Sequence, residues 1–107
     1  MQADVQGSTI LRAARPADYP AIAALLVAAG LPTDGVVEWL PRFVVAEHEG
    51  RVAGVAGLEV HGGDGLLRSV AVAEEWRGRG LGNGLTAEVL ASARKEGLRA
   101  VYLLTNT

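Results

Sequence analysis

The sequence predicts an α/β protein, a mixed β-sheet flanked by helices in the order β-α-α-β-β-β-α-β. Three observations point to this class. Apolar residues recur with the spacing of an amphipathic helix in two stretches, 18–29 and 81–94. Short runs rich in valine, leucine and alanine, bounded by glycine and charged residues, fill the other intervals. No internal repeat or low-complexity tract interrupts this order, so we expect helices packed on one sheet.

The first strand is expected at residues 8–13. Asp18 is a candidate N-cap for the helix that follows, and Pro20 is tolerated in its first turn. Gly30 fits the position just after the end of this helix. Residues 33–42 then form a connection that contains a second, short helix.

Three antiparallel strands are expected next, at residues 43–48, 51–60 and 66–72. A two-residue turn joins the first pair, and a glycine-rich turn joins the second pair. Gly54 and Gly57 interrupt the middle strand, where they indicate a bulge or a close approach of the backbone.

The second amphipathic helix is expected to end at Gly97. Residues 100–104 form a last strand, which should run parallel to the strand before the helix. The predicted buried face of the helix comprises Leu81, Leu85, Val89, Leu90 and Ala93.

The length limits the chain to one domain or part of one. Half of its 107 residues are hydrophobic, which suffices for a core and argues against disorder. Ten basic and 12 acidic residues give a net charge of −2, which disfavours a nucleic-acid binder. Cysteine is absent, which excludes disulfides and thiolate metal sites, and we expect no metal centre.

Residues 1–7 are expected to be a flexible polar lead-in, and residues 8–107 the domain itself. The lead-in lacks the basic and apolar pattern of a signal peptide. The longest apolar stretch, residues 21–31, is shorter than the roughly 20 residues that cross a bilayer. We therefore expect a cytoplasmic protein without membrane contact.

The most informative motif is Arg77-Gly78-Arg79-Gly80-Leu81-Gly82, which lies between a predicted strand and a predicted helix. Free backbone N–H groups and the helix dipole favour an anion at such a place, and the two arginines add positive charge. The spacing does not match the dinucleotide pattern G-x-G-x-x-G, and no lysine lies near this turn, as a nucleotide P-loop requires. The motif therefore predicts a pyrophosphate cradle of another kind. The alternative is an ordinary helix-start turn with solvated arginines.

This motif resembles the acyl-coenzyme A loop of the GNAT superfamily of N-acetyltransferases, Q/R-x-x-G-x-G/A, with Arg77, Gly80 and Gly82 at the specified positions. The strand before it, the helix after it and the hairpin in front also match that family, up to its fifth strand. Residues 43–105 more narrowly resemble the acetyltransferases associated with arsenic-resistance operons. The resemblance implies a GNAT-like acetyl-CoA-binding domain that is C-terminally short, lacking the usual last helix and strands.

The resemblance implies acetyl-CoA as cofactor, with coenzyme A as the product. The diphosphate would bind the loop, and the pantetheine arm would pair with the preceding strand as an added strand does. An N–H group of that strand would polarise the thioester carbonyl. The implied cofactor-binding residues are Val70, Ala71, Val72, Arg77, Gly78, Arg79, Gly80, Leu81, Gly82 and Asn83.

Two charged residues are candidates for the acceptor side of the site. Glu59 could act as the catalytic base, directly or through a water, and its alternative is a surface glutamate. Arg68 lies two residues before Val70 and should share its face of the sheet. An arginine in a central strand needs an anionic partner, either a substrate carboxylate or an ion pair with Glu59 or Glu47.

The predicted function is an N-acetyltransferase that moves an acetyl group directly from acetyl-CoA to the amine of a small, amino-acid-like molecule. One alternative is a C-terminally incomplete acyl-CoA-binding module with weak or no activity. Another is a phosphate-binding domain unrelated to acyl transfer. An uncovered sheet edge at the C-terminal side favours self-association, as a homodimer.

Overall fold

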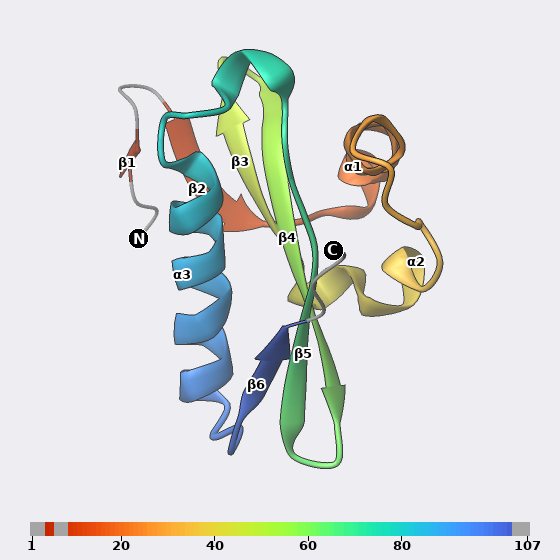
Figure 1. Ribbon diagram of the computed structural model, residues 1–107, viewed down its shortest axis with the longest axis vertical. Coiled ribbons are helices and arrows are strands. Elements are labelled where there is room, and N and C mark those ends of the chain that lie inside the picture. Colours follow the sequence, from red (N-terminus) through yellow and green to blue (C-terminus); the bar gives the residue numbers. More distant parts are fainter. Residues whose placement is uncertain (1–3, 6–8, 104–107) are drawn as a thin grey trace.

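The computed structural model describes residues 4–5 and 9–103, and it shows one twisted sheet with helices on both faces (Figure 1). The strand order in the sheet follows the sequence, β1-β2-β3-β4-β5-β6. Neighbouring strands are antiparallel except β5 and β6, which are parallel. The strands are β1 (Asp4–Val5), β2 (Thr9–Ala13), β3 (Val44–His48), β4 (Arg51–His61), β5 (Asp64–Val72) and β6 (Val101–Leu103). The predicted mixed sheet is therefore confirmed.

The helices are α1 (Tyr19–Ala28), α2 (Val36–Trp39) and α3 (Leu81–Lys95). Short 3₁₀ turns lie at Pro16–Asp18, Leu40–Arg42 and Glu74–Trp76. Among the described residues, no helix is both long and apolar enough to span a membrane. One short element was not expected: β1 lies within residues 1–7 and pairs with β2, where the sequence predicts only a lead-in.

The end of α1 follows the sequence-based expectation. Gly30 has φ +72, in the left-handed region that glycine adopts without steric cost. The N–H groups of Gly30 and Leu31 donate to the carbonyls of Val27 and Leu26, at 3.0 and 2.8 Å. These two bonds satisfy the last carbonyls of the helix and direct the chain back over the sheet.

Asp18 does not cap α1 with its side chain, contrary to the expectation. Its carboxylate accepts hydrogen bonds from the Arg12 guanidinium at 2.8 and 2.9 Å and from the backbone N–H of Arg15 at 2.7 Å. Arg12 also donates to Glu47 at 2.7 Å. Asp18 therefore ties the turn before α1 to strands β2 and β3. The ion pair with Arg12 lowers the pKa of Asp18 and raises that of Arg12.

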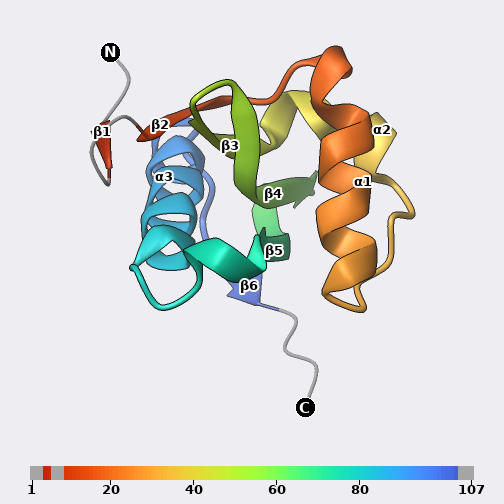
Figure 2. The same cartoon turned by 90° about the horizontal axis from the view of Figure 1, so that it is seen from above.

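The sheet separates α3 from α1 and α2, as the view from above shows (Figure 2), and each side of the sheet has its own apolar core. One core lies between the sheet and α3 and includes Leu11, Leu58, Leu67, Leu81, Leu85 and Val89. The other lies under α1 and α2 and includes Ile22, Leu26, Val36, Phe43, Val45 and Val55. The predicted buried face of α3 is correct except for Leu90, which is 39% exposed.

Close packing explains the two glycines of β4. A Cβ atom on Gly57 would lie 2.3 Å from the Phe43 ring, and one on Gly54 would lie 2.8 Å from the Leu85 side chain. The expected close approach of the backbone is therefore confirmed, and it occurs on both faces of β4.

Candidate functional site

A β-bulge interrupts β5 at its centre. Arg68 pairs with Gly57 of β4, whereas Ala71 pairs with Val55, so β5 carries one residue more than β4 between these pairs. Within the bulge, Ser69 has φ +59, a left-handed conformation that few non-glycine residues adopt. The bulge therefore resets the alternation of side chains along β5.

This reset contradicts the expectation that Arg68 shares a face with Val70. Arg68 lies on the α1 and α2 side of the sheet, where Gly35 is so close that a Cβ there would lie 3.0 Å from Arg68 Nη1. Val72 packs against the core on the α3 side. Alternation beyond the bulge gives Val70 the face of Val72, opposite to Arg68.

The pairing of β5 with β6 is short. Val101 to Leu103 pair only with Gly65 to Leu67, so β5 from Arg68 to Val72 has no strand partner on that side among the described residues. The backbone groups of this segment that point away from β4 are of the kind that an extended ligand pairs with in β-strand addition, although the Val72 carbonyl already accepts a hydrogen bond from Arg77.

The glycine-rich loop has the conformation that its composition predicts. Gly78 and Gly80 have φ +77 and +80, and a Cβ on either would meet no atom within 4 Å. The loop is therefore held in a glycine conformation and faces open space. A shallow cavity of about 300 Å³ lies in front of it. Seven of the ten predicted cofactor residues line this cavity: Val72, Arg77, Gly78, Gly80, Leu81, Gly82 and Asn83.

Both loop arginines make specific contacts. Arg77 Nε donates to the Val72 carbonyl at 3.2 Å, and the Arg79 guanidinium lies 4.9 Å from the centre of the Trp76 ring. The first contact ties the loop to the end of β5, and the second is a cation–π interaction. Positive charge is thereby kept beside the N-terminus of α3.

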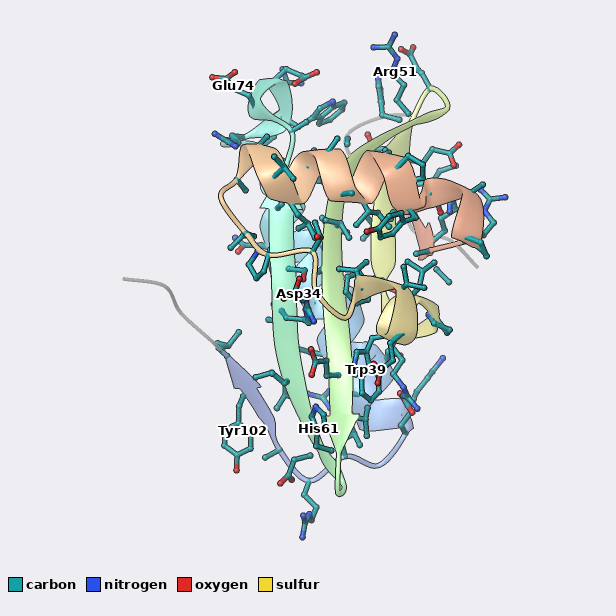
Figure 3. All side chains as sticks on the ribbon, turned by 90° about the vertical axis from the view of Figure 1, so that its right-hand side faces the viewer. Asp34, Trp39, Arg51, His61, Glu74 and Tyr102 are labelled. Atoms are coloured by element: carbon teal, nitrogen blue, oxygen red, sulfur yellow. The ribbon has the colours of Figure 1, made fainter. Side chains whose placement is uncertain are left out.

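A second cavity, of about 330 Å³, lies at the other end of the open β5 segment. It is formed where the loop between α1 and α2 passes over β4 and β5 (Figure 3). Its lining residues are Leu31, Pro32, Asp34, Glu59, Leu66, Arg68 and Ser69. We call it the acceptor-side cavity. It brings together the two predicted residues Glu59 and Arg68.

Glu59 and Arg68 form an ion pair, with Arg68 Nη1 donating to Glu59 Oε2 at 2.6 Å. Arg68 Nε also donates to Ser69 Oγ at 2.8 Å. Of the partners proposed for Arg68, the ion pair with Glu59 is present, and Glu47 instead binds Arg12. The Arg68 side chain is 12% exposed and the Glu59 side chain is 16% exposed, so the pair is largely shielded from solvent.

The second oxygen of Glu59 accepts a hydrogen bond from His61 Nε2 at 2.8 Å. The His61 ring packs edge-on against Trp39, with 5.4 Å between the ring centres. His61 and then Arg68 lower the pKa of Glu59, and together they outweigh the opposing effect of burial. Glu59 is therefore a half-buried carboxylate whose lowered pKa keeps it ionised at neutral pH.

Sequence reasoning missed Asp34, and it weighed His61 only as a weaker acid–base candidate whose alternative is a solvated turn residue. Asp34 lies on a connection without periodic pattern, so nothing in the sequence placed it near Glu59. His61 follows Glu59 at the spacing of two residues that places side chains on one strand face, and this signal could have linked them.

The Acetyltransferase (GNAT) family model matches residues 10–107 of the chain. An uncharacterised N-acetyltransferase of Chlorobaculum tepidum is 30% identical over 105 residues, which cover 91% of this chain and 68% of that protein. An amino-acid acetyltransferase of Mycobacterium tuberculosis is 35% identical over 108 residues, covering 90% of this chain and 61% of that protein.

Two solved structures have the same fold. A Mycobacterium tuberculosis protein in complex with CoA and NLQ superposes with a TM-score of 0.82 at 32% identity, covering 89% of this chain and 63% of that one. The N-acetylglutamate synthase of Neisseria gonorrhoeae, complexed with coenzyme A and N-acetyl-glutamate, gives 0.81 at 25% identity, covering 91% and 25%. The chain thus spans less than two thirds of either solved relative.

Proposed function

Because the chain belongs to the acetyltransferase (GNAT) family, we propose that it transfers an acetyl group directly from acetyl-CoA to the amine of a small, amino-acid-like molecule. One observation carries this proposal. The open segment of β5 begins at the acceptor-side cavity, at Arg68, and ends at the loop cavity, at Val72. A single extended cofactor lying along this segment would reach both cavities.

The residues of this chain fit acetyl-CoA, which supplies the acetyl thioester when bound. The N–H groups from Arg79 to Asn83, at the start of α3, would hold the diphosphate. The backbone of Val70, Ala71 and Val72 would pair with the pantetheine arm. Gly78 and Gly80 carry no side chains that would block the approach of the diphosphate to the loop backbone.

Glu59 is the proposed base. An amine in the acceptor-side cavity would displace the thiol of acetyl-CoA, with a C–N bond formed as the C–S bond breaks. Glu59 would accept the proton that the amine loses, and the departing thiolate would take a proton from solvent. A strand N–H at the bulge would stabilise the negative charge that develops on the carbonyl oxygen.

Arg68 is the proposed carboxylate-binding residue. A substrate carboxylate in the cavity would replace Glu59 as its partner, which frees a Glu59 oxygen for the amine proton. The solved relatives support an amino-acid-like acceptor, since one of them is an N-acetylglutamate synthase. Arg68→Ala should therefore raise the acceptor KM with little effect on cofactor affinity.

The test combines cofactor binding with thiol release. Coenzyme A should raise the melting temperature of the wild-type chain and of Glu59→Gln equally, but not that of Gly82→Trp, whose indole would fill the cradle. Glu59→Gln should lower kcat/KM for thiol release from acetyl-CoA by about 100-fold or more. Glu38→Gln, an exposed change on α2, serves as the control. If Gly82→Trp still responds to coenzyme A, the diphosphate lies elsewhere.

A competing proposal is an acyl-CoA-binding module with little transfer activity. It rests on the Glu59–Arg68 ion pair, because a carboxylate with a lowered pKa is a weaker base. Coenzyme A binding without thiol release for any of a panel of amino-acid-like amines would favour this module over the enzyme.

We also propose that two copies associate through the outer edge of β6. This strand exposes Tyr102 and Leu103, at 59% and 63%, beside an edge that has no neighbour among the described residues. Light scattering at micromolar concentrations should give a dimer mass, which Leu103→Lys should reduce. A monomeric wild-type chain would contradict it. A cytoplasmic location and the arsenic-resistance subfamily likewise remain proposals.

A further inference from the structure

We infer that Asp34 makes the acceptor-side cavity selective for molecules that carry a second cationic group besides the amine that is acetylated. This inference rests on the proposed function, because it concerns the acceptor of that reaction. It assigns to Asp34 a role in specificity, as a residue that touches the acceptor without taking part in the chemistry.

Asp34 shares the cavity with the proposed base and the proposed carboxylate-binding residue. It lies on the loop between α1 and α2, in front of β4 and β5 (Figure 3). The next residue, Gly35, has φ +79 and lies close to Arg68. A Cβ atom on Gly35 would come within 3.0 Å of the Arg68 guanidinium. The loop therefore lies next to Arg68, and the exposed Asp34 lines the cavity from this loop.

The charges of the cavity do not balance. Arg68 is neutralised by Glu59, with which it makes a 2.6 Å ion pair. Asp34 has no ion pair or hydrogen bond among the described residues. The other lining residues are apolar except Ser69, whose hydroxyl accepts from Arg68. Two carboxylates against one guanidinium leave the cavity with one net negative charge.

This excess charge favours a cation near Asp34. An acceptor whose carboxylate exchanges onto Arg68 and whose reacting amine faces Glu59 would direct its remaining end toward Asp34. A side-chain ammonium there would gain a charge-assisted hydrogen bond. A side-chain carboxylate would meet a like charge, which is how a site rejects a competing substrate.

The experiment compares three acceptors of similar length, with acetyl-CoA held constant: ornithine with an ammonium, norvaline with no charge and glutamate with a carboxylate on the side chain. We expect kcat/KM for thiol release to fall in that order. Asp34→Asn should reduce the ratio of ornithine to norvaline about fivefold, the scale of a partly exposed ion pair. Asp34→Lys should favour glutamate. Glu38→Gln on α2, which does not line the cavity, should leave all ratios unchanged.

A wild-type preference for glutamate, or an ornithine-to-norvaline ratio that Asp34→Asn leaves unchanged, overturns the inference. Calorimetric titration measures the binding of the three acceptors to the chain in the presence of coenzyme A. This measurement distinguishes a failure of the inference from a failure of the proposed function. If no acceptor releases thiol, the proposed transfer fails. Tighter binding of ornithine than of norvaline that depends on Asp34 still supports the inference, and equal binding overturns it.

Discussion

Arg12 is the cation of a buried charge cluster that joins β2, β3 and the turn before α1. The Arg12 and Asp18 side chains are only 11% and 10% exposed, and their contact is bidentate. A buried pair of this kind contributes little relative to apolar residues, but removing Asp18 leaves Arg12 with only the partly exposed Glu47 as a close anionic partner. Breaking this cluster should therefore cost more free energy than the intact pair contributes relative to apolar residues.

We expect Asp18→Asn to lower the free energy of unfolding by about 3 kcal/mol, because it leaves Arg12 with less compensating charge. Urea denaturation monitored by circular dichroism measures this change. Glu49→Gln, at a side chain that is 77% exposed, should change stability by no more than about 0.5 kcal/mol. A similar loss in both variants would show that the Asp18 cluster has no special role.

The pKa of Asp18 adds a pH dependence to this prediction. Arg12 lowers that pKa in the folded state, so folding is favoured by the ionised form. The contribution is complete above the unfolded pKa, near 4, and is lost as the pH falls through the lower, folded pKa. The stability difference between wild type and Asp18→Asn should therefore shrink as the solution is acidified. A difference that is constant across this pH range would contradict the assignment.

At Glu59, the largest cause of the lowered pKa is the hydrogen bond from His61. His61→Ala should therefore raise the pKa of the Glu59 carboxyl toward its ordinary value, while the Arg68 pair keeps part of the effect. Carbon-detected NMR titration of that carboxyl measures the shift. His48→Ala, at the hairpin between β3 and β4, lies at the opposite end of β4 and should leave the Glu59 titration unchanged.

Among the elements, β4 contains a glycine that is tightly packed, and α3 contains one with space for a side chain. Gly57 in β4 faces the Phe43 ring at a distance that leaves no room for a methyl group. Gly84 in α3 has space, since a Cβ there would lie 3.8 Å from the Leu11 side chain.

Gly57→Ala should destabilise the protein by about 1 to 3 kcal/mol through overpacking. Gly84→Ala should stabilise it by about 1 kcal/mol, because alanine is the better helix former. Thermal unfolding of both variants against wild type tests the pair. Equal effects of the two substitutions would mean that the Phe43 contact is not as tight as described.

The elements also show what the sequence can predict. The hairpin of β3 and β4 and the glycine after α1 were placed correctly, because turn residues and alternation are local signals. The bulge in β5 was missed, because serine at position 69 gives no hint of a left-handed conformation. That single error placed Arg68 on the face of Val70, and it is why the position of Arg68 could be settled only from the structure.

At the scale of the whole molecule, the site joins segments that are distant in the sequence. The loop before α2 contributes Asp34, β4 contributes Glu59, and β5 contributes Arg68. The family resemblance located the glycine loop, since its motif is continuous in the sequence. The acceptor-side cavity depends on how α1 directs the following loop over the sheet, and no local pattern encodes this.

The two cores should contribute independently to stability, since they lie on opposite faces of the sheet. The effects of Ile22→Val and Val89→Ala on the free energy of unfolding should therefore add, to within about 0.5 kcal/mol in the double variant. Within one core, Ile22→Val and Phe43→Leu should deviate more from additivity. Strong coupling across the sheet would contradict this independence.

The separation of the cores has a consequence for how such a protein changes over evolutionary time. The α3 face supports the loop that is proposed to hold the cofactor, and the opposite face supports the acceptor-side cavity. The sheet lies between Asp34 and α3, so substitutions around Asp34 should have little effect on the packing of α3. Selection for a different acceptor could therefore change the residues on one side of the sheet. The residues on the other side would still be selected for the same cofactor.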